Sequence, residues 1–202
     1  QQVMGAGVYA SANCDLGEFY ATAAGYTTLP AETQRALNVD PSEESDIDGG
    51  APYWRFAFEH DWGASHLEVG SYGLHAQTYP QRMKTEGKDD ITDIGFDSQY
   101  QFLGDLNEVT IGVNYLNEWA TWDASQALGF ASNANDYLWS ATATVQYLFD
   151  KTYGADIQYF HTGGNHDDLL YGSRTGSPET NGAVFEVDYL PFNKSGGPRF
   201  WP

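Results

Sequence analysis

Carboxylate side chains recur at even spacings within several segments of the chain. Asp93 and Asp97 lie four positions apart in one segment, and Glu186 and Asp188 lie two positions apart in another. Even spacing places side chains on one face of a β-strand. A row of carboxylates along a wet face attracts cations and repels anions, so these residues indicate selection of ions by charge.

The acidic bias extends to the whole chain, which has 28 Asp and Glu residues against nine Lys and Arg residues and a net charge of −19. This balance argues against nucleic acid as a partner, because binding phosphate needs Lys and Arg. An unpaired carboxylate in a dry core loses its hydration at a high cost in free energy. Since Arg55 is the one basic residue within the predicted strands, the acidic face must contact water or a basic partner.

The histidines and the single Cys14 form no motif typical of an enzyme. The sequence has no GxSxG, HExxH, P-loop, GxGxxG or CxxCH pattern, and these are the signatures of common hydrolases, nucleotide-binding proteins and c-type haem proteins. His66 near Glu68 and His166 beside Asp167 are candidate acid–base pairs, but no nucleophile accompanies either of them. We therefore predict no catalytic residue, no metal site and no cofactor.

Hydrophobic periodicity divides the chain into long β-strands. Most of them have about ten residues or more. That is longer than the ~5–6 residues usual in globular proteins and close to the ~9–11 residues of a tilted bilayer crossing. The nine predicted strands are Gln2–Ala12, Leu16–Thr27, Tyr53–Trp62, Ser65–Tyr79, Thr92–Leu103, Asn107–Trp122, Asp136–Phe149, Thr152–His161 and Gly182–Pro191.

The connections between these strands alternate in length. The long ones span about residues 28–52, 80–91, 123–135 and 162–181, and the short ones have two or three residues. In an antiparallel meander this alternation gathers the long loops at one end, as in outer-membrane β-barrels. The acidic run DPSEESDIDGG reads as a solvated loop, and calcium binding is an alternative although the spacing does not match an EF-hand loop. The acids of this run are Asp40, Glu43, Glu44, Asp46 and Asp48.

The segment Asp136–Phe149 has one apolar face with aromatic residues at both ends. Tyr137 and Trp139 begin this face, small residues follow, and Tyr147 and Phe149 end it. Aromatic rings at the two membrane–water interfaces, with small residues between them in the hydrocarbon layer, are typical of a strand that crosses a bilayer. Other strands extend this pattern. We predict an aromatic girdle of Trp54, Trp62, Tyr137, Trp139, Tyr147, Phe149, Tyr153, Tyr159 and Tyr189.

The opposite face of the same strands is strongly acidic. If the apolar set faces lipid, the polar set faces a lumen whose carboxylates favour cations. An alternative is that these acids only hold water inside a plugged barrel. The strand Ser65–Tyr79 changes phase along its length, which predicts a β-bulge near Gly70. The predicted lumen residues are Arg55, Glu59, Asp61, Glu68, Asp93, Asp97, Glu108, Glu118, Asp156, Glu186 and Asp188.

Several segments of the chain resemble outer-membrane β-barrel proteins of Gram-negative bacteria. They are PYWRFAFEHDWGASHLEVGSYGL, TDIGFDSQYQFLGD, NEWATWDASQALG and DDLLYGSRTGSPETNGAVFEVDYLPF, which cover most of residues 52–192. More narrowly, the chain is similar to a porin-like group often found beside multihaem c-type cytochromes. The resemblance implies transport or a role near extracellular electron transfer, with a multihaem cytochrome or another outer-membrane protein as partner. It identifies no functional residue.

These observations predict one all-β domain over residues 1–202, an antiparallel up-and-down transmembrane β-barrel of the bacterial outer membrane. Bacterial single-chain barrels have even strand numbers, so nine strands predict an incomplete barrel of about ten to twelve. The predicted function is a porin-like channel with an acidic lumen that passes small cationic or neutral solutes across the lipid bilayer. The alternative is a non-channel structural or binding β-rich subunit that docks a basic partner or a cytochrome.

Overall fold

The computed structural model describes residues 2–42 and 45–191, and long antiparallel strands dominate it. Alternation of apolar and polar residues favours these strands, because each strand then presents one kind of side chain to each side of a sheet. A short additional strand, β3, lies within a long loop. The strands are β1 (Val3–Cys14), β2 (Gly17–Thr28), β3 (Asp46–Ile47), β4 (Ala51–Trp62), β5 (Ser65–Tyr79), β6 (Asp89–Leu103), β7 (Asn107–Thr121), β8 (Asn135–Phe149), β9 (Tyr153–Gly164) and β10 (Thr180–Tyr189).

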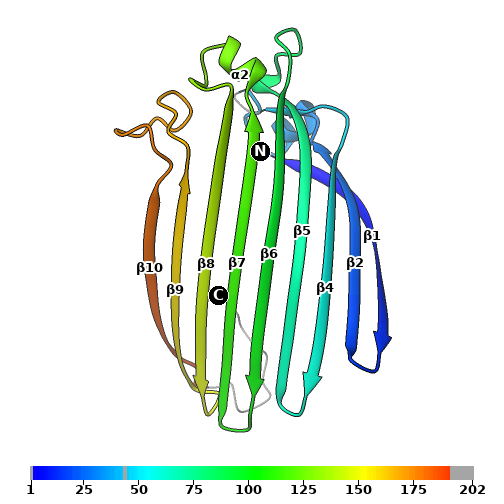
Figure 1. Ribbon diagram of the computed structural model, residues 1–202, viewed down its shortest axis with the longest axis vertical. Helices are drawn as coiled ribbons and strands as arrows, with labels where there is room; N and C mark the ends of the chain where they lie inside the picture. Colours follow the sequence, from blue (N-terminus) through cyan, green and yellow to red (C-terminus); the bar gives the residue numbers. More distant parts are fainter. Residues whose placement is uncertain (1, 43–44, 192–202) are drawn as a thin grey trace.

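The strands form one antiparallel sheet in the order β1-β2-β4-β5-β6-β7-β8-β9-β10, with β3 paired to the end of β5 (Figure 1). The predicted all-β, up-and-down fold is thus confirmed. The long loops lie at one end of the sheet and the tight turns at the other. The loops contain the short helices α1 (Ala31–Ala36), η1 (Pro80–Arg82) and α2 (Asp123–Ala127). In the part of the chain that the structure describes, no helix has the length and apolarity needed to span a membrane.

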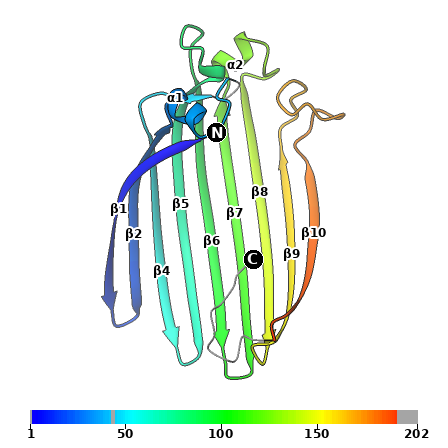
Figure 2. The same cartoon turned by 180° about the vertical axis from the view of Figure 1, so that it is seen from behind.

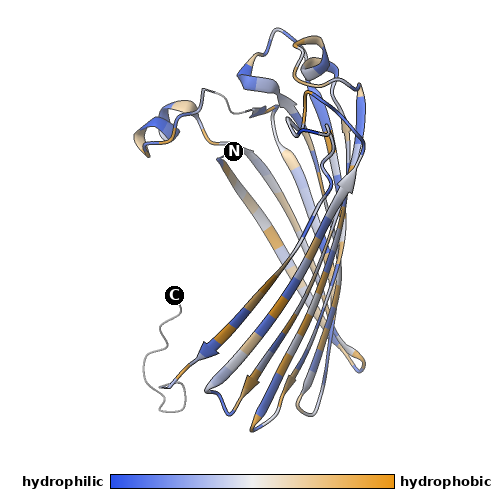
Figure 3. Ribbon diagram, turned by 90° about the vertical axis from the view of Figure 1, so that its left-hand side faces the viewer, coloured by the Kyte–Doolittle hydropathy of each residue, from blue (hydrophilic) through white to orange (hydrophobic). Residues whose placement is uncertain are grey.

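The sheet curves strongly without closing. Figure 2 shows parts of both edge strands, β1 and β10, bending toward the viewer, and Figure 3 shows the resulting trough from the side. Within the described residues, β1 pairs with β2 alone and β10 pairs with β9 alone. This part of the chain therefore forms an open sheet that is not closed into a barrel, and the incomplete barrel of about ten to twelve strands stays a prediction from the sequence.

Uninterrupted pairing keeps the two faces of the sheet chemically separate. Each pair of neighbouring long strands stays in one register along its length. One face carries large apolar side chains that are exposed. Phe96, Ile157 and Val187 on this face are 55%, 50% and 85% exposed. Residues of the opposite face are mostly polar or small, and their side chains are less exposed.

The polar face is the concave side of the trough. Side chains from strands two apart meet on it, since Arg55 of β4 contacts Asp97 of β6 across β5. Its small residues, such as Ala57 and Ala120, are buried by their neighbours. The apolar face is accordingly the convex side. We call the two surfaces the concave face and the convex face.

The predicted β-bulge near Gly70 is wrong. β5 pairs with β4 and with β6 in continuous register through this position. Tyr72 and Leu74 therefore lie on the concave face, whereas a bulge would have placed them on the convex face. The physical reason is a neighbouring glycine. A Cβ atom at Gly95 would lie 2.2 Å from Cζ of Tyr72, so the tyrosine ring fills the space that this glycine leaves.

The sheet is a single layer without a conventional hydrophobic core. A water-soluble domain of this size normally buries Leu, Ile, Val and Phe between two layers. Here such residues are exposed on the convex face, and large exposed apolar surfaces are typical of contacts with protein or membrane. Among the described residues, the buried apolar side chains are the two loop prolines Pro41 and Pro80 and six alanines, namely Ala51, Ala57, Ala76, Ala120, Ala124 and Ala131.

Candidate functional site: the acidic concave face

The strand register places every predicted lumen residue on the concave face. Asp61, Glu108 and Asp188 lie near the tight-turn end, one position from an end of their strands. Other acids face each other directly on neighbouring strands, where like charges destabilise a sheet unless water or cations screen them. These facing acids are Glu59 with Glu68, Asp93 with Glu118, and Asp156 with Glu186.

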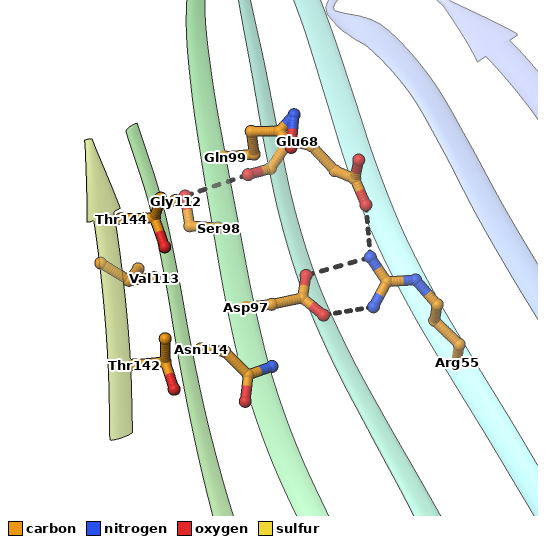
Figure 4. Close-up of a pocket in the computed structure, with 10 residues that line it drawn as sticks. All are labelled: Arg55, Glu68, Asp97, Ser98, Gln99, Gly112, Val113, Asn114, Thr142 and Thr144. Atoms are coloured by element: carbon orange, nitrogen blue, oxygen red, sulfur yellow. Dashed lines mark hydrogen bonds and ion pairs between the residues drawn. The ribbon is translucent and has the colours of Figure 1, made fainter. Parts of the chain in front are cut away.

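Arg55 joins two carboxylates of the concave face into one cluster (Figure 4). Its guanidinium contacts both oxygens of Asp97, with Nη2 donating to Oδ1 at 3.0 Å, and it also contacts Glu68. The planar fork of arginine suits a carboxylate bound through both oxygens. Among the described residues, Arg55 is the one basic side chain within a strand. One cation between two anions leaves the cluster with a net negative charge.

A glycine leaves the space that this cluster occupies, and a hydrogen-bonded pair of side chains lies beside it. A Cβ atom at Gly70 would lie 2.7 Å from Oδ1 of Asp97 and 2.9 Å from Nη2 of Arg55, so a larger residue there would displace the ion pair. Beside the cluster, the hydroxyl of Tyr72 and the side-chain amide of Asn114 are joined by hydrogen bonds of 3.1 and 2.8 Å. The concave face is thus ordered by side chains that cross between strands.

A polar hollow of about 400 Å³ opens beside the cluster. Its wall combines the charged side chains with the uncharged side chains of Gln99, Asn114, Thr142 and Thr144. Such a wall can hydrogen-bond water or a polar solute while the carboxylates set its charge. Even spacing assigns these uncharged residues to the same polar face as the acids. The predicted lumen residues were chosen by charge and therefore did not include them.

The predicted girdle residues all lie on the convex face, mostly near its two ends. Toward the loop end, Trp139 stacks on His161 with ring centroids 4.8 Å apart. Toward the tight-turn end, Tyr153 stacks on Tyr189 with ring centroids 5.4 Å apart. Tyr159 is an exception, because its cross-strand partner Ala143 lies near the middle of β8. It therefore lies between the two aromatic groups.

The distance between the aromatic groups fits a bilayer. Tyr147 follows Tyr137 by ten positions on β8, with small residues such as Ala141 and Ala143 between them. Ten residues of strand span about 34 Å, or about 26 Å along the membrane normal at a tilt of about 40°. The apolar band of an outer-membrane barrel is ~25 Å tall. The membrane position of these residues stays a prediction from the sequence.

A buried carboxylate holds two of the long loops together. Asp167 is 0% exposed, and it accepts hydrogen bonds of 2.7–3.0 Å from the backbone N–H groups of Ser132, Asn133, Leu169 and Leu170. Burial alone would raise the pKa of Asp167, but these donors hold that pKa well below its ordinary value. The carboxylate thus fastens the loop after β7 to the loop after β9. We call this arrangement the loop clasp.

A second buried carboxylate, Asp89, caps the first turn of α2. It is 2% exposed and accepts hydrogen bonds from the backbone N–H groups of Ala124 and Ser125 at 3.0 and 2.9 Å. The hydroxyl of Ser125 donates to it at 2.5 Å. These N–H groups have no partner within the helix itself, so Asp89 supplies the acceptor that a helix start requires. The cap fastens the loop after β7 to the start of β6.

The acidic loop before β4 is paired with basic residues. Asp46 contacts Lys84 at 3.2 Å, and Asp48 contacts Lys88. The pair of Asp48 with Lys88 lowers the pKa of Asp48 and raises the pKa of Lys88. Among the described residues, no three His, Cys, Asp or Glu side chains are grouped to hold a metal ion. Two acids of the calcium alternative, at 43–44, lie outside the described residues.

The candidate acid–histidine pairs have partners other than the predicted ones. Nδ1 of His66 lies 2.8 Å from Oδ1 of Asp61. Nε2 of His166 lies 3.4 Å from Oδ1 of Asp168. Asp167, the neighbour considered from the sequence, is occupied by the loop clasp. The absence of enzymatic activity stays a prediction.

No protein-family model matches this chain, and no curated protein matches it. The resemblance to porin-like outer-membrane proteins therefore remains an expectation drawn from the sequence. The functional argument rests on the two faces of the sheet and on the residues that they carry.

Proposed function

We propose that the protein is a porin-like channel of the bacterial outer membrane, with its convex face in lipid and its concave face lining a water-filled lumen. The observation that carries this proposal is the division of chemistry between the two faces of one single-layer sheet. Large apolar side chains are exposed on the convex face, and carboxylates line the concave face. Lipid solvates the first set and water solvates the second.

The edges of the sheet also support a barrel. An unpaired strand edge presents backbone donors and acceptors, which a bilayer accepts only when they are bonded. β1 and β10 run in the same direction, because every step along the strand order is antiparallel. An antiparallel ring then needs an odd number of further strands between these edges. This requirement agrees with a total of about ten to twelve strands.

The solutes that fit such a lumen are small cations and small neutral molecules. Carboxylates along β4 to β6 attract cations and repel anions. Three concave residues of β8, Ser140, Thr142 and Thr144, are uncharged and can hydrogen-bond a neutral polar solute. Association with a multihaem cytochrome or another outer-membrane protein follows from the resemblance alone. A barrel of this size would contact such a partner laterally or at a mouth.

A second candidate function is a non-channel structural or binding β-rich subunit. One observation favours it, namely that Glu68 and Asp97 already bind a guanidinium group, that of Arg55. A basic partner or a cytochrome with exposed Arg and Lys residues could bind to the other carboxylates in the same manner. In that case the convex face would be covered by protein.

Conductance in planar lipid bilayers separates these candidates. We expect cation-selective current steps from the detergent-extracted protein, and we expect Glu118→Gln with Glu186→Gln to move the reversal potential toward zero. Asp168→Asn with Glu179→Gln removes the same two charges from exposed positions of one loop and is the control. Absence of current steps, or release of the protein from membranes by a salt wash, would contradict the channel. Unchanged selectivity in the double variant would remove both acids from the lumen.

A further inference from the structure

We infer that Arg55 is the specificity-determining residue of the concave face, acting as a tethered counter-ion that keeps a divalent cation out of a site between Glu68 and Asp97. The inference rests on the proposed function, because the ions concerned are those that enter the lumen. It goes further by assigning one residue a role in distinguishing monovalent from divalent cations.

The position of Arg55 along the trough supports this role. Cross-strand register sorts the concave residues of β4 to β7 into levels two residues apart, which is ~7 Å along a strand. Of the five levels from that of Asp61 to that of Asp93, four contain an acid and the level of Arg55 contains none, since the cross-strand neighbours of Arg55 are Tyr72, Gly95 and Leu116. From the tight-turn end, the acidic levels contain Asp61, then Glu59 with Glu68, then Asp97, and beyond Arg55 they contain Asp93 with Glu118.

The contacts of Arg55 are those that a bound cation would make. Its guanidinium takes both oxygens of Asp97 and one oxygen of Glu68, so three carboxylate oxygens converge on one positive group. Gly70 places no side chain between the two acids. Gln99 and Asn114, whose side chains are amides, line the same hollow. Carboxylate and amide oxygens are the kind of ligand that Ca²⁺ prefers.

A tethered arginine has a clear consequence for permeation. Conduction requires a site that binds an ion well enough to admit it and weakly enough to release it. Two free carboxylates converging at mid-lumen would hold a divalent cation and block the passage of others. Arg55 satisfies these two acids permanently, so no cation is held between them and cations move along the remaining carboxylates. The chain therefore favours the passage of monovalent cations, and Arg55 neutralises part of the negative charge of the concave face.

The test removes the tethered charge and measures divalent binding in two ways. We expect Arg55→Gln to raise the affinity of the full chain for Tb³⁺ and Ca²⁺ by about tenfold or more, because two carboxylates become free. Tb³⁺ luminescence in detergent gives the affinity without requiring a channel. In bilayers, Ca²⁺ should block Arg55→Gln at about tenfold lower concentration than wild type. Arg174→Gln makes the same change of charge on an exposed loop and should behave as wild type.

The outcomes separate this inference from the proposed function. Equal Tb³⁺ affinity for wild type and Arg55→Gln would overturn the inference even if both conduct ions. Higher Tb³⁺ affinity without any conductance would uphold the counter-ion and defeat the channel. Arg55→Lys gives an independent answer should Arg55→Gln fail to fold. Lysine contacts one carboxylate at a time, so it should raise Ca²⁺ affinity, and an affinity equal to that of wild type would overturn the inference.

Discussion

At the scale of single residues, Gly95 decides how Tyr72 lies on the concave face. A Cβ atom at Gly95 would meet Cζ of Tyr72 at 2.2 Å, whereas one at Gly112 would have no atom within 4 Å. We expect Gly95→Ala to lower the free energy of unfolding by about 1–3 kcal/mol, as overpacking does. Gly112 is also on the concave face, and Gly112→Ala should leave the free energy of unfolding unchanged or raise it. Thermal unfolding in detergent measures both, and equal stabilities would contradict this placement of Tyr72.

Asp167 gives the loop clasp a defined dependence on pH. Its pKa is lowered in the folded protein, so the clasp stabilises the loops fully above the unfolded pKa of about 3.9. This stabilisation is lost as the pH falls from about 3.9 through the lowered pKa that Asp167 has in the folded protein. At neutral pH, Asp167→Asn should give faster amide hydrogen exchange at Ser132 and Leu170. The control is Asp168→Asn, at an exposed neighbour, and equal protection in the two variants would disprove the clasp.

At the scale of elements, β9 offers two adjacent exposed positions that only a membrane would distinguish. Ile157 lies on the convex face and Gln158 on the concave face. Arginine facing the bilayer midplane costs about 2–4 kcal/mol, whereas a lumen position tolerates it. We expect Ile157→Arg to reduce assembly into membranes and Gln158→Arg to preserve it, as judged by heat-modifiable migration in gels. In water both exposed positions would accept arginine with little effect, and such a result would contradict the lipid-facing assignment.

The long strands could be predicted because period-two alternation is strong in them, and each observed boundary lies within three residues of the predicted one. The phase of β5 could not be predicted, since Tyr72 depends on space at Gly95 of another strand. Glu18 faces Glu59 and was missed, because alternate positions of β2 hold small residues such as Ala21 that give little contrast. The helices and β3 lie in loops that depend on distant partners.

At the scale of the whole molecule, the acidic character of one face was predictable and its internal organisation was not. Charge and spacing assign the acids to one side of a sheet. The cluster of Arg55 with Glu68 and Asp97 needs strand curvature and a glycine at position 70, which alternation does not encode. The loop clasp likewise needs backbone donors brought from two loops. Local pattern thus predicts the faces, and tertiary contacts determine the site.

The most direct test of the central claim measures water and lipid exposure at two adjacent residues. Ala143 lies on the convex face of β8 and Thr144 on the concave face. In a Cys14→Ser background, with the protein in lipid vesicles, Thr144→Cys should react with a charged, water-borne maleimide and Ala143→Cys should not. A spin label at Ala143→Cys should instead be relaxed by oxygen dissolved in lipid. Reaction of both cysteines with the charged maleimide would contradict a lipid-facing convex face and a water-filled lumen.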